Sequence, residues 1–339
     1  MENILFKVER IVNETEFSRT LYLSSTGEKI AYKAGQFLTF ILNLYGKEIR
    51  RSYSFGSTPG IDDELFITIK RIENGAVSRY FFEHIKEGDT LISLPPSGRF
   101  TIEESDDRVY FFIAAGSGIT PIFSLLKQLL FQQNNKVILL YQNTDERSSI
   151  YRRQIKELQK KFANRFTLVE IFSKPIEAKQ PQRLNNHLLE KIITEHISEG
   201  EDILFYLCGH LEFMRMAHFT LRVMGYKEEQ VKKENFVIDF IPKAPFMDDT
   251  SPKSVVIHFN GRTHNIQVAY PHNILEVALK NNIQLPYSCR GGRCSTCTAT
   301  CISGSIKMSI NDVLTDKDLE KGLILTCVGY PETDVELQL

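Results

Sequence analysis

The stretch VYFFIAAGSGITPIFSLLKQLL, residues 109–130, joins an apolar run to a helical pattern through a glycine turn. The run VYFFIAA is apolar throughout, which is typical of a strand buried on both faces. Beyond the turn, apolar residues recur at the spacing of one helical face: Ile122, Leu125, Leu126, Leu129 and Leu130. The stretch therefore predicts a buried strand, a tight turn and a helix whose apolar side packs on a sheet.

The glycine turn between these two elements suits a nucleotide phosphate. Gly116 and Gly118 permit a sharp bend and a close approach of the backbone to a pyrophosphate at the start of the helix. We expect Thr120 to cap this helix and Pro121 to lie in its first turn. The pattern is G-x-G-x-x-P and not the usual G-x-G-x-x-G, so a plain strand–turn–helix without a ligand is the alternative.

Strands and helices alternate on the C-terminal side of this stretch. The runs at 136–142, 166–172 and 202–209 have the character of buried strands, and the segments 149–162 and 184–197 have helical periodicity. This alternation predicts an α/β nucleotide-binding domain with a parallel sheet.

That domain is expected to span residues 104–240 and to bind its ligand at the carboxyl ends of the strands. Cys208 and Gly209 end the last strand, so they fall on the same edge as the glycine turn. When Cys208 is considered alone, a buried core thiol is the plainer interpretation.

Residues 1–103 have a different pattern. The segments QFLTFIL, RSYSFGS and LFITIKR alternate between apolar and polar residues, with turn signals between them. Strict alternation is typical of half-buried antiparallel strands, so we expect an antiparallel β-barrel or sandwich here.

The RSYS stretch in this region carries groups that suit a flat cofactor. Arg51 and Tyr53 share one face of the expected strand, and Ser52 and Ser54 share the other. An aromatic ring beside an arginine and hydroxyl groups can stack on a heterocycle and hold its phosphates.

A second stretch, ITIKRIENGAVSRYFF, offers an anion site. Lys70, Gly75 and Ser78 come before or at the start of a short helix, whose N-terminus can receive a phosphate. The alternative is that Asn74 and Gly75 form an ordinary hairpin turn.

The chain changes character again after residue 240. Residues 241–253 contain three prolines and no periodicity, which predicts a linker. The following region, 254–339, opens with VVIHFNGRTHNIQV, which we interpret as one amphipathic strand, and it holds five of the six cysteines.

Four of these cysteines have the spacing of a plant-type ferredoxin. Cys289, Cys294 and Cys297 form C-x4-C-x2-C, and Cys327 follows at a distance, which is the pattern that holds two irons and two sulfides. Gly291 and Gly292 in the loop let backbone amides approach the sulfurs. A structural zinc site or free thiols are the alternatives. We expect the fifth cysteine of this region, Cys301, to be a small core residue.

Composition narrows the class of protein. The 339 residues carry 41 basic and 42 acidic side chains, a net charge of -1 that argues against binding nucleic acid by bulk electrostatics. The charged N-terminus has no signal-peptide core, and no apolar run is long enough to span a bilayer. We therefore expect a cytoplasmic protein with reduced thiols.

Taken together, the motifs resemble the ferredoxin-NADP reductase superfamily. R-x-Y-S at 51–54, G-x-x-S at 75–78, GSGITP at 116–121 and CG at 208–209 occur in the order typical of that superfamily. With a plant-type [2Fe-2S] ferredoxin domain of α+β, β-grasp fold behind them, they are similar to the multidomain reductases that serve oxygenases. GSGITPI, SIYR at 149–152, CRGGRCSTC and ILTCVGYP are most similar to the reductase subunit of phenylacetyl-CoA epoxidase in phenylacetate degradation.

The resemblance implies a role for each matched residue. It places the FAD against Arg51, Ser52, Tyr53, Ser54, Thr68, Ile69, Lys70, Gly75, Ala76, Val77 and Ser78. It places the nicotinamide dinucleotide on Gly116, Ser117, Gly118, Ile119, Thr120, Pro121, Cys208 and Gly209. Tyr53, Ser54 and Cys208 would lie closest to the reacting rings. Cys289 and Cys294 would hold one iron, and Cys297 and Cys327 the other.

Charged residues after the strand at 136–142 bear on which nicotinamide nucleotide is the reductant. Arg147 and Arg152 follow the strand at 136–142 and favour NADPH, because they can bind a 2′-phosphate. Asp145 and Glu146 lie at the same edge and favour NADH, whose 2′-hydroxyl they can accept. Some reductases of this general type use FMN, although FAD is our expectation.

The electron acceptor is expected to be a separate protein. A flavin takes a hydride from NAD(P)H and passes single electrons to an iron–sulfur cluster, so the expected route ends outside this chain. None of the eight histidines has a glutamate three positions before it, so the chain lacks the Glu-x-x-His pairs of a di-iron oxygenase. Besides the epoxidase, another oxygenase, a desaturase or a hybrid-cluster protein is an alternative acceptor. A redox-sensing module is the alternative from another functional class.

Overall fold

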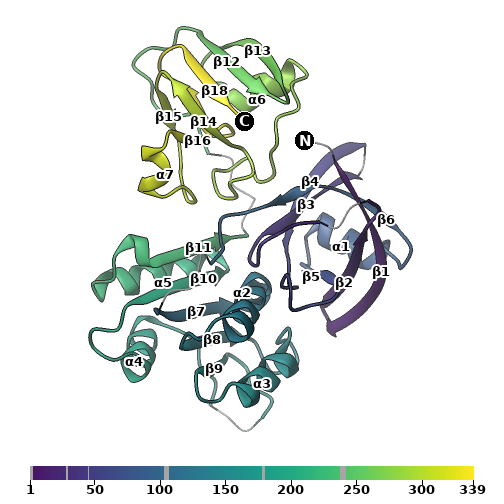
Figure 1. Cartoon of the computed structure of the whole chain (residues 1–339), viewed down its shortest axis with the longest axis vertical. Helices are drawn as coiled ribbons and strands as arrows, with labels where there is room; N and C mark the ends of the chain where they lie inside the picture. The colour runs from purple at the N-terminus through teal and green to yellow at the C-terminus, as the bar shows by residue number, and fades with distance from the viewer. Residues whose placement is uncertain (1–2, 28–29, 45, 103–106, 178–179, 237–241) are drawn as a thin grey trace. The chain divides into compact units, whose positions relative to one another are not determined.

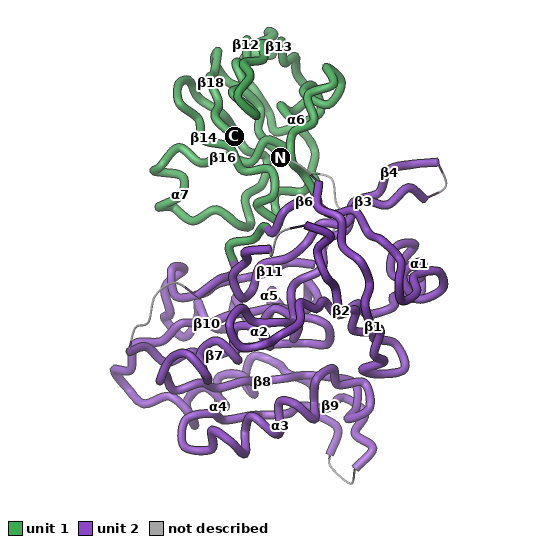
Figure 2. Tube along the Cα trace, turned by 45° about the vertical axis from the view of Figure 1, so that its right-hand side comes forward, with its two compact units in different colours: residues 1–2, 97–99, 237–339 green, residues 3–96, 100–236 purple. Residues whose placement is uncertain are grey.

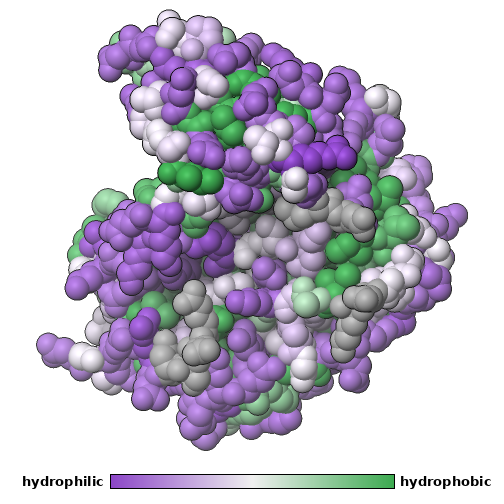
Figure 3. All heavy atoms as spheres, turned by 45° about the horizontal axis from the view of Figure 1, so that its top comes forward, coloured by the Kyte–Doolittle hydropathy of each residue, from purple (hydrophilic) through white to green (hydrophobic). Residues whose placement is uncertain are grey.

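A computed structural model of the chain describes residues 3–27, 30–44, 46–102, 107–177, 180–236 and 242–339 (Figure 1). It divides into two compact units, the larger of residues 3–96 and 100–236 and the smaller of residues 1–2, 97–99 and 237–339 (Figure 2). None of the described helices is long and apolar enough to cross a membrane. The face drawn in Figure 3 is mostly hydrophilic, with apolar residues in small separate patches.

The N-terminal part of the larger unit is a six-stranded sheet in the order β4-β3-β6-β1-β2-β5. The strand pairs β1–β2, β1–β6, β2–β5 and β3–β4 are antiparallel, and a bridge between Phe55 and Ile67 joins the two edges, as the predicted barrel requires. Helix α1 inserts Val77 and Phe81 into the core of this barrel. The elements are β1 (Ile4–Thr15), β2 (Ser18–Ser25), β3 (Phe37–Leu44), β4 (Lys47–Ser54), β5 (Leu65–Lys70), α1 (Ala76–Glu83) and β6 (Thr90–Ser97).

The second part of the larger unit is a parallel five-stranded sheet in the order β11-β10-β7-β8-β9, with a core on each face. Helices α2 and α3 contribute to one core, and α4 and α5 to the other. The elements are β7 (Val109–Ala115), α2 (Ile119–Gln132), β8 (Val137–Asn143), α3 (Arg152–Lys161), β9 (Phe166–Phe172), α4 (Asn186–His196), β10 (Ile203–Gly209), α5 (Leu211–Val223) and β11 (Val231–Asn235). This is the predicted α/β architecture.

The strand order of this sheet indicates where a ligand belongs. The chain runs from β7 outward to β8 and β9, and then returns to place β10 on the other side of β7. Adjacent strands whose connections run in opposite directions leave a crevice at their carboxyl ends. Those ends carry the loop after Ala115 on β7 and the Cys208–Gly209 pair on β10.

The smaller unit is an α+β fold built on a mixed sheet in the order β13-β12-β18-β14-β16. Strand β18 runs parallel to β12 and antiparallel to β14, and helix α6 buries Ile274 and Ala278 in the core. The elements are β12 (Lys253–Phe259), β13 (Arg262–Val268), α6 (Ile274–Lys280), β14 (Thr298–Ser303), β15 (Ile306–Met308), α7 (Asp316–Glu320), β16 (Leu323–Leu325), β17 (Gly329–Pro331) and β18 (Val335–Gln338).

The prediction of a single strand over 255–268 was wrong. The segment forms the hairpin β12–β13, with Asn260 and Gly261 at φ of 52° and 70°. Positive φ at two central residues is the geometry of the tight turns that join antiparallel strands, and Asn-Gly is their preferred pair. The alternation of apolar residues continues through the turn, which hid it.

The predicted linker is partly attached to the smaller unit. Residue 241 lies outside the described residues, and β12 begins at Lys253. Met247 is buried, and Lys307 Nζ donates to the carbonyl oxygen of Phe246 at 3.0 Å. The part of the predicted linker around Met247 therefore packs on the smaller unit, to which it belongs. The domain boundaries themselves stay a prediction.

Candidate functional site

The glycine turn forms a short 3-10 turn, Gly116–Gly118, that runs directly into α2. Gly116 has φ of +53°, a conformation that favours glycine. Pro121 lies in the first turn of α2, as expected, but the prediction that Thr120 caps the helix was wrong. The cap position is Gly118, and the Thr120 hydroxyl donates to the carbonyl of Ser117 at 3.0 Å. Because the 3-10 turn already continues into the helix, Thr120 is helical and cannot cap it.

The end of β10 lies directly beneath this turn. Cys208 pairs in register with Ala114 on one side and with Glu234 on the other. Its side chain is fully buried, and burial first, then the Glu234 carboxylate, raises the pKa of the Cys208 thiol. The thiol therefore stays protonated and provides a small, polarisable surface rather than a nucleophile. A β-carbon at Gly209 would lie 2.8 Å from Phe213, so glycine is required there as well.

Strand β4 presents the RSYS residues with the expected alternation. Ser54 is buried, and Ser52 exchanges a hydrogen bond of 2.8 Å with Thr39 on β3. The Tyr53 ring meets the edge of Phe81 from α1 at a centroid distance of 5.4 Å. Burial raises the pKa of Tyr53, so its hydroxyl stays protonated. The ring is thus held in one orientation by the barrel core.

The β5–α1 connection is a helix start and not a hairpin. Gly75 is the residue before α1, which begins with Ala76 and Val77. Ser78 Oγ donates to the Gly75 carbonyl at 3.2 Å and accepts from the Ile72 amide at 3.1 Å. The turn that the sequence assigned to an anion therefore leads into the N-terminus of a helix.

Strand β5 brings this region against the Gly116–Gly118 turn. Thr68 and Ile69 are buried, whereas Lys70 is exposed at the strand end. A β-carbon at Gly116 would lie 3.3 Å from Lys70 Nζ. Tyr151, at the start of α3, shares a hydrogen bond with the Thr68 hydroxyl. The residues predicted to bind FAD and those predicted to bind the nicotinamide dinucleotide are therefore adjacent within the larger unit.

The two arginines that the sequence assigned to a 2′-phosphate differ in their surroundings. Arg147 is exposed and has no ion pair with another described residue. Arg152 makes two contacts with Glu170 on β9, at 2.7 and 3.3 Å, and its guanidinium lies 3.8 Å from Glu177. The Glu170 contact, more than any other, raises the pKa of Arg152. Arg152 is thus already neutralised by a carboxylate.

Asp145 and Glu146, the two acidic residues near Arg147, accept hydrogen bonds from backbone amides. Asp145 Oδ1 accepts from the Ser148 amide at 2.8 Å, and the Asp145 amide donates to Ser148 Oγ at 3.1 Å. Glu146 is buried and accepts from the Ile176 amide at 2.8 Å. That hydrogen bond is the main cause that lowers the pKa of Glu146.

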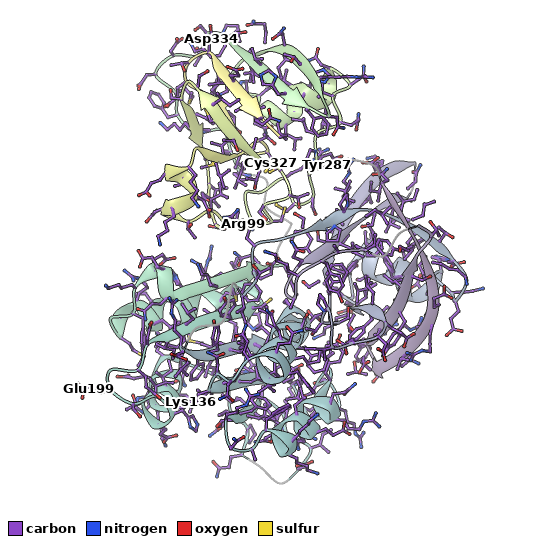
Figure 4. All side chains as sticks on the ribbon, viewed as in Figure 1. Arg99, Lys136, Glu199, Tyr287, Cys327 and Asp334 are labelled. Atoms are coloured by element: carbon purple, nitrogen blue, oxygen red, sulfur yellow. The ribbon has the colours of Figure 1, made fainter. Side chains whose placement is uncertain are left out.

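In the smaller unit, all four predicted cluster ligands are buried, and Figure 4 labels one of them, Cys327. The Cys289 thiol lies within hydrogen-bonding reach of Cys294 and Cys327, and Cys327 lies within reach of Cys297. The Gly291 amide points at Cys289 Sγ at 3.4 Å, and the Cys289 amide points at Cys294 Sγ at 3.5 Å. Four buried thiols with amides directed at their sulfurs are the donor set that a [2Fe-2S] cluster needs.

The cluster loop is held by its backbone and by one ion pair. Arg290, Gly292 and Ser295 adopt positive φ, which bends the chain around the thiols. Arg293, which is almost fully buried, pairs with Asp312 at 3.1 Å. Cys301 lies outside the group, on β14, where it packs half-buried against the core.

Three functional candidates escaped sequence reasoning. Glu234 and Lys127 are buried and Asp62 is half-buried, but in the sequence they have the appearance of solvated side chains. Glu234 lies on β11, beside Cys208 on β10, and this pairing left no signal in the sequence. No pattern pointed to the other two.

Models of three domain families match the chain. They are an oxidoreductase FAD-binding domain over residues 3–102, an oxidoreductase NAD-binding domain over residues 112–218 and a 2Fe-2S iron-sulfur cluster binding domain over residues 257–332. The FAD, nicotinamide and [2Fe-2S] sites inferred from the sequence thus each have a matching domain.

Similar proteins of known role cover almost the whole chain. The ferredoxin reductase component of 3-ketosteroid-9-alpha-monooxygenase from Rhodococcus rhodochrous is 32% identical over 98% of this chain and 95% of its own. One subunit of the 1,2-phenylacetyl-CoA epoxidase from Escherichia coli K12 is 30% identical over 90% of this chain and 88% of its own. The solved structure of phthalate dioxygenase reductase has the same fold, with a TM-score of 0.60 and 21% identity over 99% of this chain and 98% of its own.

The fold, the adjacency of the residues predicted to bind flavin and nucleotide, the buried thiols and these relatives agree. This chain is an oxidoreductase that belongs to the ferredoxin-NADP reductase-like flavoprotein reductases with a C-terminal 2Fe-2S domain, a family that includes reductase components of oxygenases.

Proposed function

We propose that this chain takes reducing equivalents from NADPH and passes them, through FAD and a [2Fe-2S] cluster, to a separate oxygenase that epoxidises phenylacetyl-CoA. The observation that carries the reductase role is the adjacency of Lys70 on β5 and the Gly116 turn. This adjacency supports a flavin and a nicotinamide that meet in one crevice.

The chain's own residues supply binding and orientation. The Gly116–Gly118 turn offers backbone amides to a pyrophosphate, and Tyr53 and the Cys208 thiol would flank the reacting rings. When bound, FAD exchanges electrons in pairs or singly, and the cluster exchanges them singly. Cys289, Cys294, Cys297 and Cys327 would hold the cluster in a buried loop, where amide dipoles stabilise the negative charge on sulfur.

The choice of acceptor rests on similarity alone. The similar subunit of the epoxidase supports phenylacetyl-CoA epoxidation at 30% identity. A steroid monooxygenase is the second candidate, because its reductase component is slightly more similar, at 32% identity over 98% of the chain. The surface around the cluster loop would select between them.

The choice of NADPH rests on Arg147. This exposed cation is free of ion pairs with other described residues, which suits a 2′-phosphate. Arg152 supports the choice less, because Glu170 already holds it.

An anaerobic titration tests the reductase role. The purified holoprotein is titrated with NADPH and, separately, with NADH, and is followed by visible absorbance and EPR. Bleaching of the flavin and a rhombic [2Fe-2S] signal at low nucleotide concentration support the proposed electron route. A flavin that is reduced while the cluster stays oxidised contradicts it.

Reconstitution tests the acceptor. The reductase is mixed with the oxygenase subunits of phenylacetyl-CoA epoxidase or with those of 3-ketosteroid-9-alpha-monooxygenase, and product is measured against nucleotide consumed. Coupled epoxide formation supports the first candidate, and coupled steroid hydroxylation supports the second.

A further inference from the structure

Helix α2 makes hydrogen bonds and an ion pair with the loop that follows β4, the strand that carries Tyr53. This loop, residues 56–62, begins two residues after Ser54, the last residue of β4, and α2 begins directly after the Gly116–Gly118 turn. We call the contacts of Ser57, Thr58 and Asp62 with Ser124 and Lys127 the α2 clamp. All five residues belong to the larger unit.

The first part of the α2 clamp is a set of neutral hydrogen bonds. Ser124 Oγ donates to the carbonyl oxygen of Ser57 at 2.6 Å, and Thr58 Oγ1 donates to the carbonyl oxygen of Ser124 at 2.9 Å. Because each residue donates to the other segment's backbone, the bonds fix both the distance and the direction of α2. Ser57, Thr58 and Ser124 are all buried.

The second part is an ion pair inside the interface. Lys127 Nζ pairs with Asp62 Oδ2, and the two side chains are 6% and 24% exposed. The same carboxylate oxygen accepts from the Thr58 amide at 2.6 Å. The ammonium also lies over the rings of Phe123 and Phe66, at 4.4 and 5.0 Å from their centroids. These contacts leave the ammonium little freedom of position.

Stability alone does not account for a charge at this position. Burying an ion pair costs desolvation that its attraction roughly offsets, and a well-packed apolar pair is often as stable or more stable. An apolar pair, however, has no preferred direction. The ion pair and its hydrogen bonds form in only one register of α2 against the loop 56–62. We therefore interpret them as contacts that fix the position of α2.

The segments on the two sides of the α2 clamp lead to the two predicted cofactor sites. On one side, three residues separate Tyr53 from Ser57 along the chain. On the other side, α2 is a continuous helix from Ile119 to Gln132, so a shift at Lys127 is transmitted to the Gly116–Gly118 turn. A misplacement of about 1 Å between reacting groups can cost about a hundredfold in rate.

We propose that Lys127 and Asp62 are positioning residues, which set the distance between the nicotinamide held by the α2 turn and the flavin held by β4. The proposal rests on the proposed function, since it assumes that both cofactors bind where the site predicts. Neither residue touches a cofactor in this account. They act through α2 and through the loop 56–62.

A double variant separates positioning from stability. Lys127→Met/Asp62→Asn replaces the ion pair in the holoprotein by two uncharged side chains of similar volume and keeps an acceptor for the Thr58 amide. We expect a melting temperature at or above that of the wild type, and a nucleotide dissociation constant within threefold of it. The limiting rate of flavin reduction at saturating nucleotide, measured by anaerobic rapid mixing, is expected to fall tenfold to a hundredfold. A limiting rate within twofold of the wild type overturns the proposal.

Asp62→Asn provides a second variant that keeps the side-chain shape and the hydrogen bond from the Thr58 amide. Its limiting rate is expected to fall threefold to tenfold with the same unchanged dissociation constant, and an unchanged rate overturns the proposal even where the double variant fails to fold.

Lys191→Met/Glu195→Gln serves as the matched control, because that pair is exposed on α4 at 3.7 Å. Its rate is expected to equal that of the wild type, and an equal loss in the control contradicts positioning by the clamp. A wild-type flavin that neither nucleotide reduces would instead contradict the proposed function, so the two failures are distinguishable.

Discussion

Gly118 lies against the carbonyl group of Cys208, so closely that a β-carbon at Gly118 would stand 2.1 Å from the Cys208 oxygen. The neighbouring atoms are backbone, which cannot swing aside as a side chain can. The nucleotide turn and the end of β10 therefore keep their spacing only while residue 118 is glycine.

Gly118→Ala tests this spacing. The methyl group would push the turn away from β10, so we expect the dissociation constant for the reducing nucleotide to rise at least tenfold, on the order of 1.4 kcal/mol. FAD and cluster content should be unchanged. The constant is obtained from the dependence of flavin reduction on nucleotide concentration. Gly27→Ala, where the added carbon meets nothing within 4 Å, is the control, and equal affinity in both variants contradicts the prediction.

Glu170→Gln tests how the nucleotide is selected. The change removes the carboxylate that neutralises Arg152, so the guanidinium becomes available to a 2′-phosphate. We expect the ratio of kcat/KM for NADPH to that for NADH to rise by roughly threefold to tenfold. Steady-state kinetics with both nucleotides and an artificial acceptor measure the ratio.

The control for that change is Glu157→Gln on α3, the helix that carries Arg152. Glu157 pairs with Arg153 at 3.7 Å on the exposed face of α3, and its replacement alters the net charge equally. Equal shifts in the two variants would mean that overall charge, and not the release of Arg152, sets the ratio.

Cys301, which is not among the four predicted cluster ligands, provides a test of the ligand assignment. Cys301 Sγ donates to the Ser303 carbonyl at 3.3 Å and lies on β14, away from the loop amides that point at the other sulfurs. Cys301→Ser is expected to keep the iron and acid-labile sulfide content of the wild type, whereas Cys297→Ser is expected to lose it. A Cys301→Ser protein without a cluster would show that the assignment of ligands is wrong.

Periodic apolar patterns predicted the architecture well, because each strand and helix buries a continuous face. The face from Ile122 to Leu130 is fully buried in the core, as its spacing indicated. Where the pattern continued through a tight turn, as at Asn260, periodicity carried no signal and the hairpin was missed.

The site was predictable where one residue type is required at a fixed spacing, as for the four thiols and the glycine turn. It was not predictable where a side chain is buried by a segment that packs on the outer side of its helix. Lys127 would face solvent on an ordinary sheet-covering helix, but here the barrel loop covers that side of α2 as well. Glu234 lies beside Cys208 through strand pairing alone, which no local pattern records.

The Arg293–Asp312 pair makes a prediction about the cluster itself. Arg293 lies in the loop between Cys289 and Cys294, and its side chain is 8% exposed. Its charge is offset by Asp312, so Asp312→Asn leaves a cation uncompensated beside the thiolates. Reduction adds negative charge to a cluster, and a nearby positive charge favours the reduced form. We expect the potential to rise by roughly 60 mV, a tenfold change in a one-electron equilibrium, as measured by an EPR-monitored redox titration.

Asp334→Asn is the matched control for this change. It alters the net charge of the smaller unit equally, but Asp334 lies at the opposite end of that unit from Cys327 (Figure 4). Its amide oxygen can still accept the hydrogen bond from the Ser254 backbone, so the fold should be kept. A surface charge at that distance is screened by solvent and salt, so its effect on the potential should be small. Equal shifts in both variants, or none in Asp312→Asn, would contradict a local effect of Arg293 and would leave the potential to the amides that point at the sulfurs.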